Sequence, residues 1–365
     1  MYEDVIRAVE ENYDCGKVVS LQKMTGGLNN DSWKGTFEQN GKQRIVFVRV
    51  WAPRKEGYEI KYESGLMEHL KEKGMKVNAQ FLLSKTGDLY VPIYLKPQVR
   101  QYLVLQEWLE GEDTYFWAES SPRTKAIKSA VRVVAQLHGY ADDYCPAEGV
   151  RCKEPVFQEQ LKHHAQDFDL WSHALAQDHF KQNLGQYMLT QLDYVKKMIS
   201  LTDKLWRNQE DLPVCNIHTD THLGNFKFVD DEVTAIFDFD WAKRDVRLYD
   251  IAMAGVTFCT SWFYDRHGAI NTELLREVLY EYNQEILRTK ARIGQLQERE
   301  AELLPIMMVG TNLYIMRDLL RQIYENRDLS DFEYLYFMIH QIECFQWIEK
   351  HYEEIIKIAK ESIIK

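Results

Sequence analysis

The sequence predicts an α+β protein with a small, β-rich N-terminal lobe and a large, mainly helical C-terminal lobe. Short, β-branched segments separated by Gly and Asn turns crowd the first third of the chain. Long segments with apolar residues at helical spacing dominate the rest. A chain of 365 residues is long enough for two such lobes. We therefore expect an N-terminal lobe over 1–105, a hinge over 106–112 and a helical lobe over 113–365.

In the N-terminal lobe, apolar alternation and β-branched residues predict five strands. They are expected at 18–24, 32–37, 44–51, 91–94 and 101–109. A short amphipathic helix is predicted over 3–13, and a second helix over 59–73 that ends at Gly74. The Asn40-Gly41 pair indicates a tight hairpin, because both residues tolerate positive φ.

In the C-terminal lobe, the apolar spacing predicts long helices. They are expected at 124–138, as one or two helices over 156–208, and at 272–300, 301–325 and 331–362. The segment 214–240 is the β-rich exception, and its Asp230-Asp231-Glu232 sequence predicts a hairpin turn.

The composition of the chain argues against some classes of binding partner. The net charge of −11 argues against a nucleic-acid backbone or an anionic membrane as the main partner. The six cysteines form no CxxC pair, the N-terminus lacks the features of a signal peptide, and no apolar run reaches the roughly 20 residues that span a bilayer. We expect a reduced, cytoplasmic protein that binds a small molecule, as a monomer or a homodimer.

The segment 214–240 carries polar side chains in an order that suits phosphoryl transfer. Asp220 lies in a loop after a predicted strand and can accept a proton from a substrate hydroxyl. Asn225 and Asp238 offer a neutral and a charged oxygen, which are suitable ligands for Mg²⁺. The predicted hairpin would bring these two residues together.

This segment resembles the catalytic loop and metal-binding strand of the aminoglycoside phosphotransferase and choline kinase superfamily, which shares the protein-kinase-like fold. The residues that match the loop of that family are His218, Asp220, His222, Gly224 and Asn225. Phe237-Asp238-Phe239-Asp240 and Tyr249-Asp250-Ile251-Ala252 match two later motifs. Thr219, Thr221 and Leu223 depart from the usual Gly, Leu and Pro.

The resemblance implies a kinase that uses ATP and Mg²⁺ to phosphorylate a hydroxyl of a small molecule. It implies that Asp220 orients or deprotonates that hydroxyl, and that Asn225 and Asp238 hold the metal. An amino alcohol or amino sugar is mildly favoured as the acceptor by the acidic balance and the many aromatic residues, but no motif specifies it.

The resemblance extends to nucleotide-binding residues of the N-terminal lobe. The turn that contains Gly27 and Asn30 is similar to the family's turn over the phosphates, where backbone N–H groups meet anionic oxygens. Arg49 occupies the position of the phosphate-binding cation, and Glu63 that of its acidic partner. Simpler alternatives are an exposed strand-end charge for Arg49 and a solvated helix face for Glu63, with Glu59 as a competitor.

Backbone groups near Gln106 and Trp108, in the strand similar to the family's hinge, would contact the adenine edge. A buried strand without a ligand is the alternative for these side chains.

Other residues keep more than one interpretation. Asp240 can bind a metal or a cationic substrate, or bond to nearby backbone. Asp250 is expected to anchor the catalytic loop. The pair His218 and His222 would need a helix to form a zinc site, and Gly224 favours a loop instead.

Two other classes of protein also remain open. Some relatives in this superfamily are structural, spore-coat-type proteins with little turnover. A protein kinase would need a long activation segment after Asp238, which the sequence does not suggest.

Overall fold

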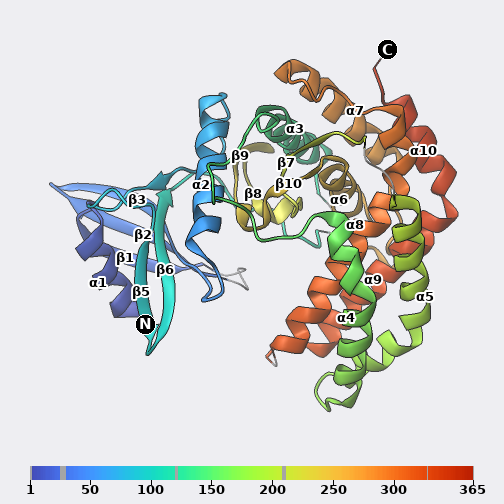
Figure 1. Ribbon diagram of the computed structural model, residues 1–365, viewed down its shortest axis with the longest axis horizontal. Helices are drawn as coiled ribbons and strands as arrows, with labels where there is room; N and C mark the ends of the chain where they lie inside the picture. Colours follow the sequence, from blue (N-terminus) through green and yellow to red (C-terminus); the bar gives the residue numbers. More distant parts are fainter. Residues whose placement is uncertain (1, 25–29, 120–121, 208–210, 327, 365) are drawn as a thin grey trace. The chain divides into compact units, whose positions relative to one another are not determined.

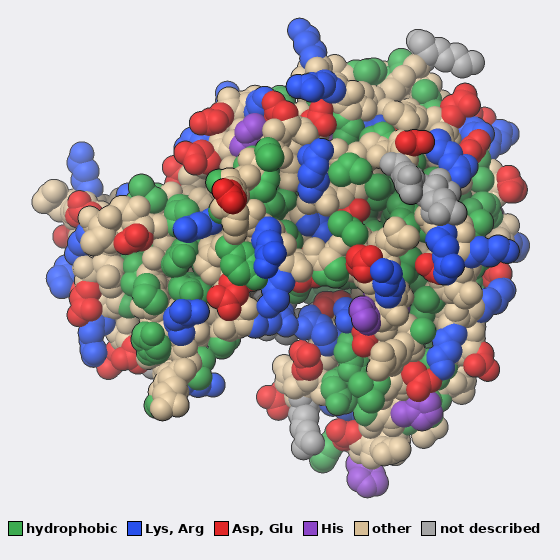
Figure 2. Space-filling model, viewed as in Figure 1, with side chains coloured by type: hydrophobic (Ala, Val, Ile, Leu, Met, Phe, Trp, Pro, Cys, Tyr) green, Lys and Arg blue, Asp and Glu red, His purple; other side chains and the backbone are tan. Residues whose placement is uncertain are grey.

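The computed structural model describes residues 2–24, 30–119, 122–207, 211–326 and 328–364. The chain divides into two compact units, each described by itself. The first unit comprises Met1–Glu112, Tyr144–Lys153 and Thr234–Asp240, and the second comprises the remaining segments. On the face seen in Figure 2, acidic and basic side chains are interspersed.

The first unit is built on a six-stranded antiparallel sheet with the order β1-β2-β3-β6-β4, in which β5 also pairs with β6 (Figure 1). The strands are β1 (Lys17–Lys23), β2 (Asp31–Gln39), β3 (Lys42–Val50), β4 (Phe81–Leu82), β5 (Val91–Lys96) and β6 (Val99–Glu107). The helices are α1 (Tyr2–Asn12) and α2 (Gly57–Glu72). Asn40 and Gly41 join β2 to β3 with φ of 54° and 75°, which is the positive-φ hairpin turn predicted from the sequence.

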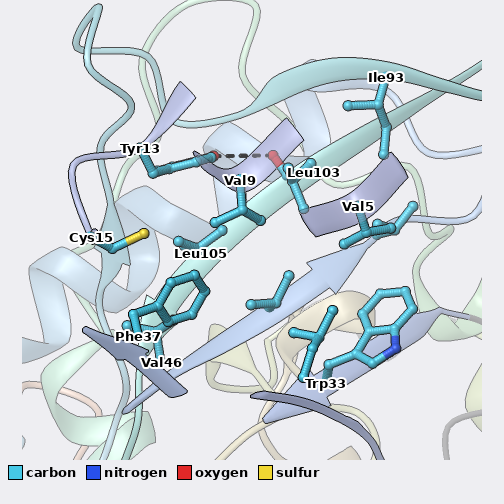
Figure 3. Close-up of a cluster of buried hydrophobic side chains, with 13 residues drawn as sticks. Val5, Val9, Tyr13, Cys15, Trp33, Phe37, Val46, Ile93, Leu103 and Leu105 are labelled. Atoms are coloured by element: carbon cyan, nitrogen blue, oxygen red, sulfur yellow. Dashed lines mark hydrogen bonds between the residues drawn. The ribbon is translucent and has the colours of Figure 1, made fainter. Parts of the chain in front are cut away.

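The core of the first unit lies between α1 and the sheet (Figure 3). Val5 and Val9 of α1 are fully buried against Leu103 and Leu105 of β6. Tyr13 Oη donates a hydrogen bond of 3.2 Å to the Leu103 carbonyl, so the helix end is tied to the strand as well as packed on it. Strand β6 pairs with β3, β4 and β5, and its apolar residues alternate between two clusters: Leu103 and Leu105 lie in this core, and Tyr102 and Val104 lie in another.

The segment Thr234–Asp240 is distant in sequence but belongs to the first unit. The Ile236 N–H donates to the Val77 carbonyl at 2.7 Å, and Asn78 and Ile236 form an isolated parallel bridge. Because the backbone is held there, the two aspartates that follow Ile236 have a defined place in this unit.

The second unit is mainly helical. Its helices are α3 (Thr124–Tyr140), α4 (Phe157–Gln177), α5 (Gln182–Trp206), α6 (Leu248–Phe258), α7 (Thr272–Thr289), α8 (Glu298–Glu325), α9 (Asp331–Lys350) and α10 (Tyr352–Glu361). Short strands β7 (Val214–Ile217) and β10 (Lys243–Val246) pair antiparallel, and β8 (Phe226–Val229) pairs with β9 (Glu232–Ile236). Asp230 and Asp231 turn between β8 and β9 with positive φ, as predicted.

Helix α6 was not predicted, α8 begins at Glu298 and not at 301, and two further helix boundaries differ from the prediction. The helix expected over 272–300 ends at Thr289, because Lys290 adopts a left-handed φ of 57°. The helix expected over 331–362 is divided at His351 into α9 and α10. Apolar spacing continues across both interruptions, so periodicity alone does not show them.

Helix α8 is long and apolar enough to span a membrane by length and composition. However, 78% of its most apolar window is buried inside the protein, as in the core helix of a soluble fold. Figure 1 shows α8 among the other helices of its unit.

Candidate active site

The candidate catalytic loop connects β7 to a one-turn 3₁₀ helix, η1 (Leu223–Asn225), in the second unit. The Asn225 Nδ2 group donates to the Asp220 carbonyl at 2.8 Å and to Asp220 Oδ2 at 3.0 Å. The His222 N–H also donates to the Asp220 carbonyl, at 3.1 Å. Because the amide nitrogen of Asn225 is held in this way, its side-chain oxygen is the atom left to meet a cation.

Asp250 on α6 anchors the start of this loop. Its two carboxylate oxygens accept hydrogen bonds from the His218 and Thr219 N–H groups, each at 2.7 Å. Asp250 is fully buried. Burial raises the pKa of Asp250. The hydrogen bond with His138, the charges of His138 and His218, and the bond from the His218 N–H outweigh this effect and hold that pKa below its usual range. Asp250 therefore remains an anionic anchor for two backbone donors.

A buried histidine continues this network away from the loop. His138 of α3 places Nε2 3.0 Å from Asp250 Oδ2 and Nδ1 2.9 Å from the Tyr282 hydroxyl of α7. Both rings are almost fully buried. Three helices thus fix the position of one loop through a chain of hydrogen bonds.

Thr219 has a φ of 72°, in the left-handed region that β-branched residues rarely adopt. The conformation costs on the order of 1–2 kcal/mol. It is held by the bond from the Thr219 N–H to Asp250 and by a 3.0 Å bond from Thr219 Oγ1 to the Trp241 carbonyl. The family's usual Gly at this position would adopt the same φ without that cost.

The side chain of Asp220 is about one-third exposed, and it lies 3.4 Å from His222 Nε2. Burial raises its pKa, but His222, His218 and the bond from Asn225 lower the pKa of Asp220 to about 2. The carboxylate is therefore ionised across the physiological range. In this state it can orient a substrate hydroxyl and accept its proton as that oxygen bonds to phosphorus.

A second cluster of charges, in the first unit, surrounds Arg49 of β3. The nearest carboxylate is Asp240, with Oδ1 2.9 Å from Arg49 Nη1. Asp238 and Glu63 lie farther from the guanidinium, at 3.7 and 3.9 Å. Arg49 is only 6% exposed, so it is a buried cation rather than an exposed strand-end charge.

The cluster around Arg49 contains more acidic than basic side chains. Lys55 adds a second cation and donates to the Asp240 carbonyl at 2.9 Å. Burial and the charge of Asp240 raise the pKa of Glu63 despite the opposing effect of Arg49. Glu63 Oε2 is buried and has no hydrogen-bond partner among the described residues. Three carboxylates that share two cations leave a deficit of positive charge.

Asn30 has a structural role in this cluster. Its Nδ2 group donates to Asp240 Oδ2 at 2.6 Å, and its Oδ1 accepts from the Ala52 N–H at 3.0 Å. Gly27, the other residue predicted in that turn, lies outside the described residues. Asn30 therefore orients Asp240 within the first unit.

The predicted adenine-binding residues lie at the end of β6 and just beyond it. Gln106 is buried, with Nε2 3.8 Å from Met67 Sδ. The Lys34 ammonium lies 4.6 Å from the centre of the Trp108 ring. Both side chains are thus engaged within the first unit, so the predicted contacts with adenine would come from the main chain of this segment.

The structure groups the predicted residues in two sets. Asn30, Arg49, Glu63 and Asp238 meet in the first unit, and Asp220 and Asn225 meet in the second. In the described part of the chain, no three His, Cys, Asp or Glu side chains form a metal site on their own. Asn225 in the second unit and Asp238 in the first each offer an oxygen of the kind that Mg²⁺ binds.

Sequence reasoning missed His138 and Lys55. His138 is a polar residue at the end of an apolar helical face, so its position gives a weak signal of a buried hydrogen-bonded side chain. Lys55 lies in a short loop after β3 and gave no signal, since exposed lysines are common in loops.

Comparison with known proteins now identifies the family. A model of the phosphotransferase enzyme family matches residues 21–290. The chain belongs to this family. Homoserine kinase from Agrobacterium fabrum is 24% identical to this family member over 316 residues, which cover 85% of this chain and 83% of the relative.

Solved structures show the same fold. The amicoumacin kinase hAmiN, in complex with AMP-PNP, Ca²⁺ and amicoumacin, has a TM-score of 0.66 at 16% identity, with 96% of this chain and 93% of that chain covered. A microcompartment-associated aminopropanol kinase has a TM-score of 0.65 at 15% identity, with 96% and 97% covered. The predicted resemblance, the kinase-like α+β fold and the enzyme class, a phosphotransferase with an alcohol acceptor, are confirmed.

Proposed function

We propose that this family member transfers the γ-phosphoryl group of ATP, in the presence of Mg²⁺, to a hydroxyl of a small molecule such as an amino alcohol or amino sugar. The proposal extends the confirmed enzyme class to a donor, a metal and an acceptor. One nucleotide analogue, AMP-PNP, and one divalent cation, Ca²⁺, in the similar amicoumacin kinase support ATP as the donor and the use of a divalent metal. The proposed location is the cytoplasm.

One observation carries the proposal. Asp220 and Asn225 are joined by a 3.0 Å hydrogen bond on a loop whose first two N–H groups are fixed by a buried carboxylate. A structural protein has no need of an ionised, one-third exposed aspartate held with this precision. Phosphoryl transfer does need it, because most of the catalysis comes from positioning and charge.

The proposed chemistry assigns one task to each group. Asp220 orients the acceptor hydroxyl and takes its proton while the oxygen attacks the γ-phosphorus in line and ADP leaves. Asn225 and Asp238 would hold Mg²⁺, which neutralises charge on the phosphates. Arg49 would bind phosphate oxygens through its planar donors, with Glu63 and Asp240 fixing its orientation.

The test is ADP release from Mg-ATP in the presence of pooled amino alcohols, hydroxy amino acids and aminoglycosides. The matched variants are Asp220→Asn in the catalytic loop and Asp230→Asn in the nearby hairpin turn, where Asn also tolerates positive φ. We expect a pool to stimulate ADP release with wild type and Asp230→Asn, but not with Asp220→Asn. Absence of Mg-ATP binding, or equal stimulation of both aspartate variants, would contradict the proposal.

A further inference from the structure

A segment between α3 and α4 belongs to the first unit, and the proposed mechanism does not use it. The chain leaves the second unit after Asp143, runs through Tyr144–Lys153 in the first unit, and re-enters the second unit at Glu154. The segment, called the strap below, reverses direction at a turn in which the Val150 N–H donates to the Ala147 carbonyl at 3.0 Å. The strap thus packs within the unit that contains α2 and β3, although both of its ends continue into the other unit.

The strap lies against one face of α2. The ring of Tyr144 is 5.9 Å from that of Tyr62 and 5.4 Å from that of His69. Toward the other end of the strap, the Arg151 guanidinium lies 5.4 Å from the centre of the Tyr58 ring. The α2 residues on the contacted face are Tyr58, Tyr62, Gly65 and His69, at intervals of four, three and four positions.

Gly65 is the point of closest approach between the strap and α2. A Cβ atom at this position would lie 2.6 Å from Tyr144 Oη and 3.5 Å from its Cζ. The same hydroxyl donates a hydrogen bond of 3.3 Å to the Tyr62 carbonyl. Burial raises the pKa of Tyr144 to about 12, so the phenol keeps the proton that it donates. Glycine is unfavourable within a helix, and here it leaves the space that the phenol occupies.

The part of α2 that is tied in this way carries Glu63. The Tyr62 carbonyl belongs to the residue directly before Glu63, and Asn78 Nδ2 holds the Met67 carbonyl at 2.6 Å. Glu63 Oε1 lies 3.9 Å from Arg49 Nη1, and both side chains are buried. Because this ion pair is already long and a helix moves as one body, a displacement of α2 would weaken it.

We propose that Tyr144 is a positioning residue for nucleotide binding: its contact with Gly65 fixes α2, so that Glu63 stays beside Arg49 when Mg-ATP binds. Tyr144 acts through the helix and does not touch the nucleotide. This inference rests on the proposed kinase function and adds a residue, from the strap, to the groups that support the Arg49 cluster.

The first test exchanges atoms across the contact, with Mg-AMP-PNP affinity measured by calorimetry. Gly65→Ala adds a methyl group that collides with the Tyr144 hydroxyl, so affinity should fall roughly tenfold although Ala is the better helix former. Tyr144→Phe loses one weak bond and should change affinity by less than about threefold. Without the hydroxyl, the added Cβ has Cζ at 3.5 Å as its nearest neighbour, so the double variant should regain most of the lost affinity.

The second test asks whether Tyr144 acts through Glu63. Tyr144→Ala should weaken Mg-AMP-PNP binding roughly tenfold in wild type, but by less than about twofold when Glu63 is already replaced by Gln. A merely structural role would weaken binding equally in both backgrounds. Tyr94→Ala, at a side chain of β5 that is 66% exposed, is the control and should leave the affinity unchanged.

Thermal unfolding of each variant is measured beside binding, so that loss of folded protein is not counted as loss of affinity. If Tyr144→Ala does not fold, the exchange between Gly65 and Tyr144 decides alone. The role of Tyr144 is wrong if Gly65→Ala binds Mg-AMP-PNP as tightly as wild type, or if Tyr144→Phe does not relieve its loss. The role is also wrong if Tyr144→Ala has the same effect in both backgrounds.

These failures differ from a failure of the proposed function. They require that wild type binds Mg-AMP-PNP, and they leave Asp220-dependent ADP release unaffected. If wild type itself does not bind Mg-AMP-PNP, the proposed donor fails, and the role of Tyr144 in nucleotide binding fails with it.

Discussion

The carboxylates of the two units are neutralised in different ways. In the catalytic loop, one aspartate is satisfied by the protein itself, because His222 and Asn225 bring the pKa of Asp220 down to about 2. In the Arg49 cluster, Asp238, Asp240 and Glu63 share two cations, and burial together with Asp240 raises the pKa of Glu63.

This difference indicates two kinds of preorganisation. The loop is complete without a ligand, so its aspartate is held in the ionised state that orients a hydroxyl. The Arg49 cluster lacks positive charge, so a divalent cation with the nucleotide would stabilise it. On the proposed function, the loop serves the chemical step and the cluster serves Mg-ATP binding, so variants in each should affect different measurements.

The largest effect is expected from Asp220→Asn. The amide keeps the size of the side chain but cannot accept a proton, so kcat should fall by roughly 10² to 10⁴. Binding of Mg-ATP, measured by calorimetry, should remain within about twofold of wild type, because the Arg49 cluster is intact. A loss of nucleotide binding equal to the loss of turnover would show that the two regions do not have separate roles.

Asp238→Ala should instead weaken the binding of the nucleotide. Removal of a proposed metal ligand should weaken Mg-dependent nucleotide binding by at least about 100-fold. Binding measured in EDTA should change little, since the contribution of the metal is absent in both proteins. Equal weakening with and without Mg²⁺ would assign Asp238 to the orientation of Arg49, 3.7 Å away, instead of to the metal.

Prediction from sequence succeeded where side chains and their spacing carry local information. The hairpin turns at Asn40 and Asp230 follow from residues that tolerate positive φ, and the fold class follows from the change in apolar period along the chain. The motifs around Asp220, Asn225 and Asp238 were sufficient to recognise the family, which the family match over residues 21–290 confirms.

The partners of these residues could not be predicted, because they come from distant segments. Asp240 rather than Glu63 makes the close contact with Arg49, across 191 positions of sequence. His138 reaches Asp250 across 112 positions. Such pairs depend on how the helices and strands pack, and the spacing of residues in one sequence does not predict this packing. The strained φ of Thr219 is hidden for the same reason, since Asp250 stabilises it.

Asp250→Asn should affect stability and turnover together. The amide loses charge-assisted bonds to two N–H groups in a fully buried position, so the free energy of unfolding should fall by about 2–4 kcal/mol. Turnover should fall roughly tenfold, as Thr219 leaves its strained conformation and Asp220 is less well oriented.

The same variant should also change how the stability of the protein depends on pH. The pKa of Asp250 is lowered in the folded state. The contribution of Asp250 to the stability of the protein is therefore present above its ordinary pKa of 3.8, and this contribution is lost as the pH falls through the lowered pKa of the folded state. Chemical denaturation from pH 3 to 7 should show this dependence in wild type and less of it in Asp250→Asn. An unchanged slope would mean that Asp250 is not the anionic anchor.

The smallest effect is expected from Glu63→Gln, and it tests the charge deficit directly. The pKa of Glu63 is raised in the folded state. The contribution of Glu63 to the stability of the protein is therefore fully present below its ordinary pKa of 4.5, and this contribution is lost as the pH rises through the raised pKa. Replacement by neutral Gln should therefore leave stability without nucleotide unchanged near pH 4.5, and should raise it at higher pH.

Mg-ATP should reverse this advantage. When the metal and nucleotide supply the missing positive charge, ionised Glu63 becomes a favourable partner of Arg49, so wild type should gain more thermal stability from Mg-ATP than Glu63→Gln does. The measurement is the shift in Tm with and without Mg-ATP at pH 8, with Glu59→Gln of α2 as the comparison. If Glu63→Gln is less stable than wild type without nucleotide at that pH, the cluster has no deficit of positive charge, and the contrast with the catalytic loop fails.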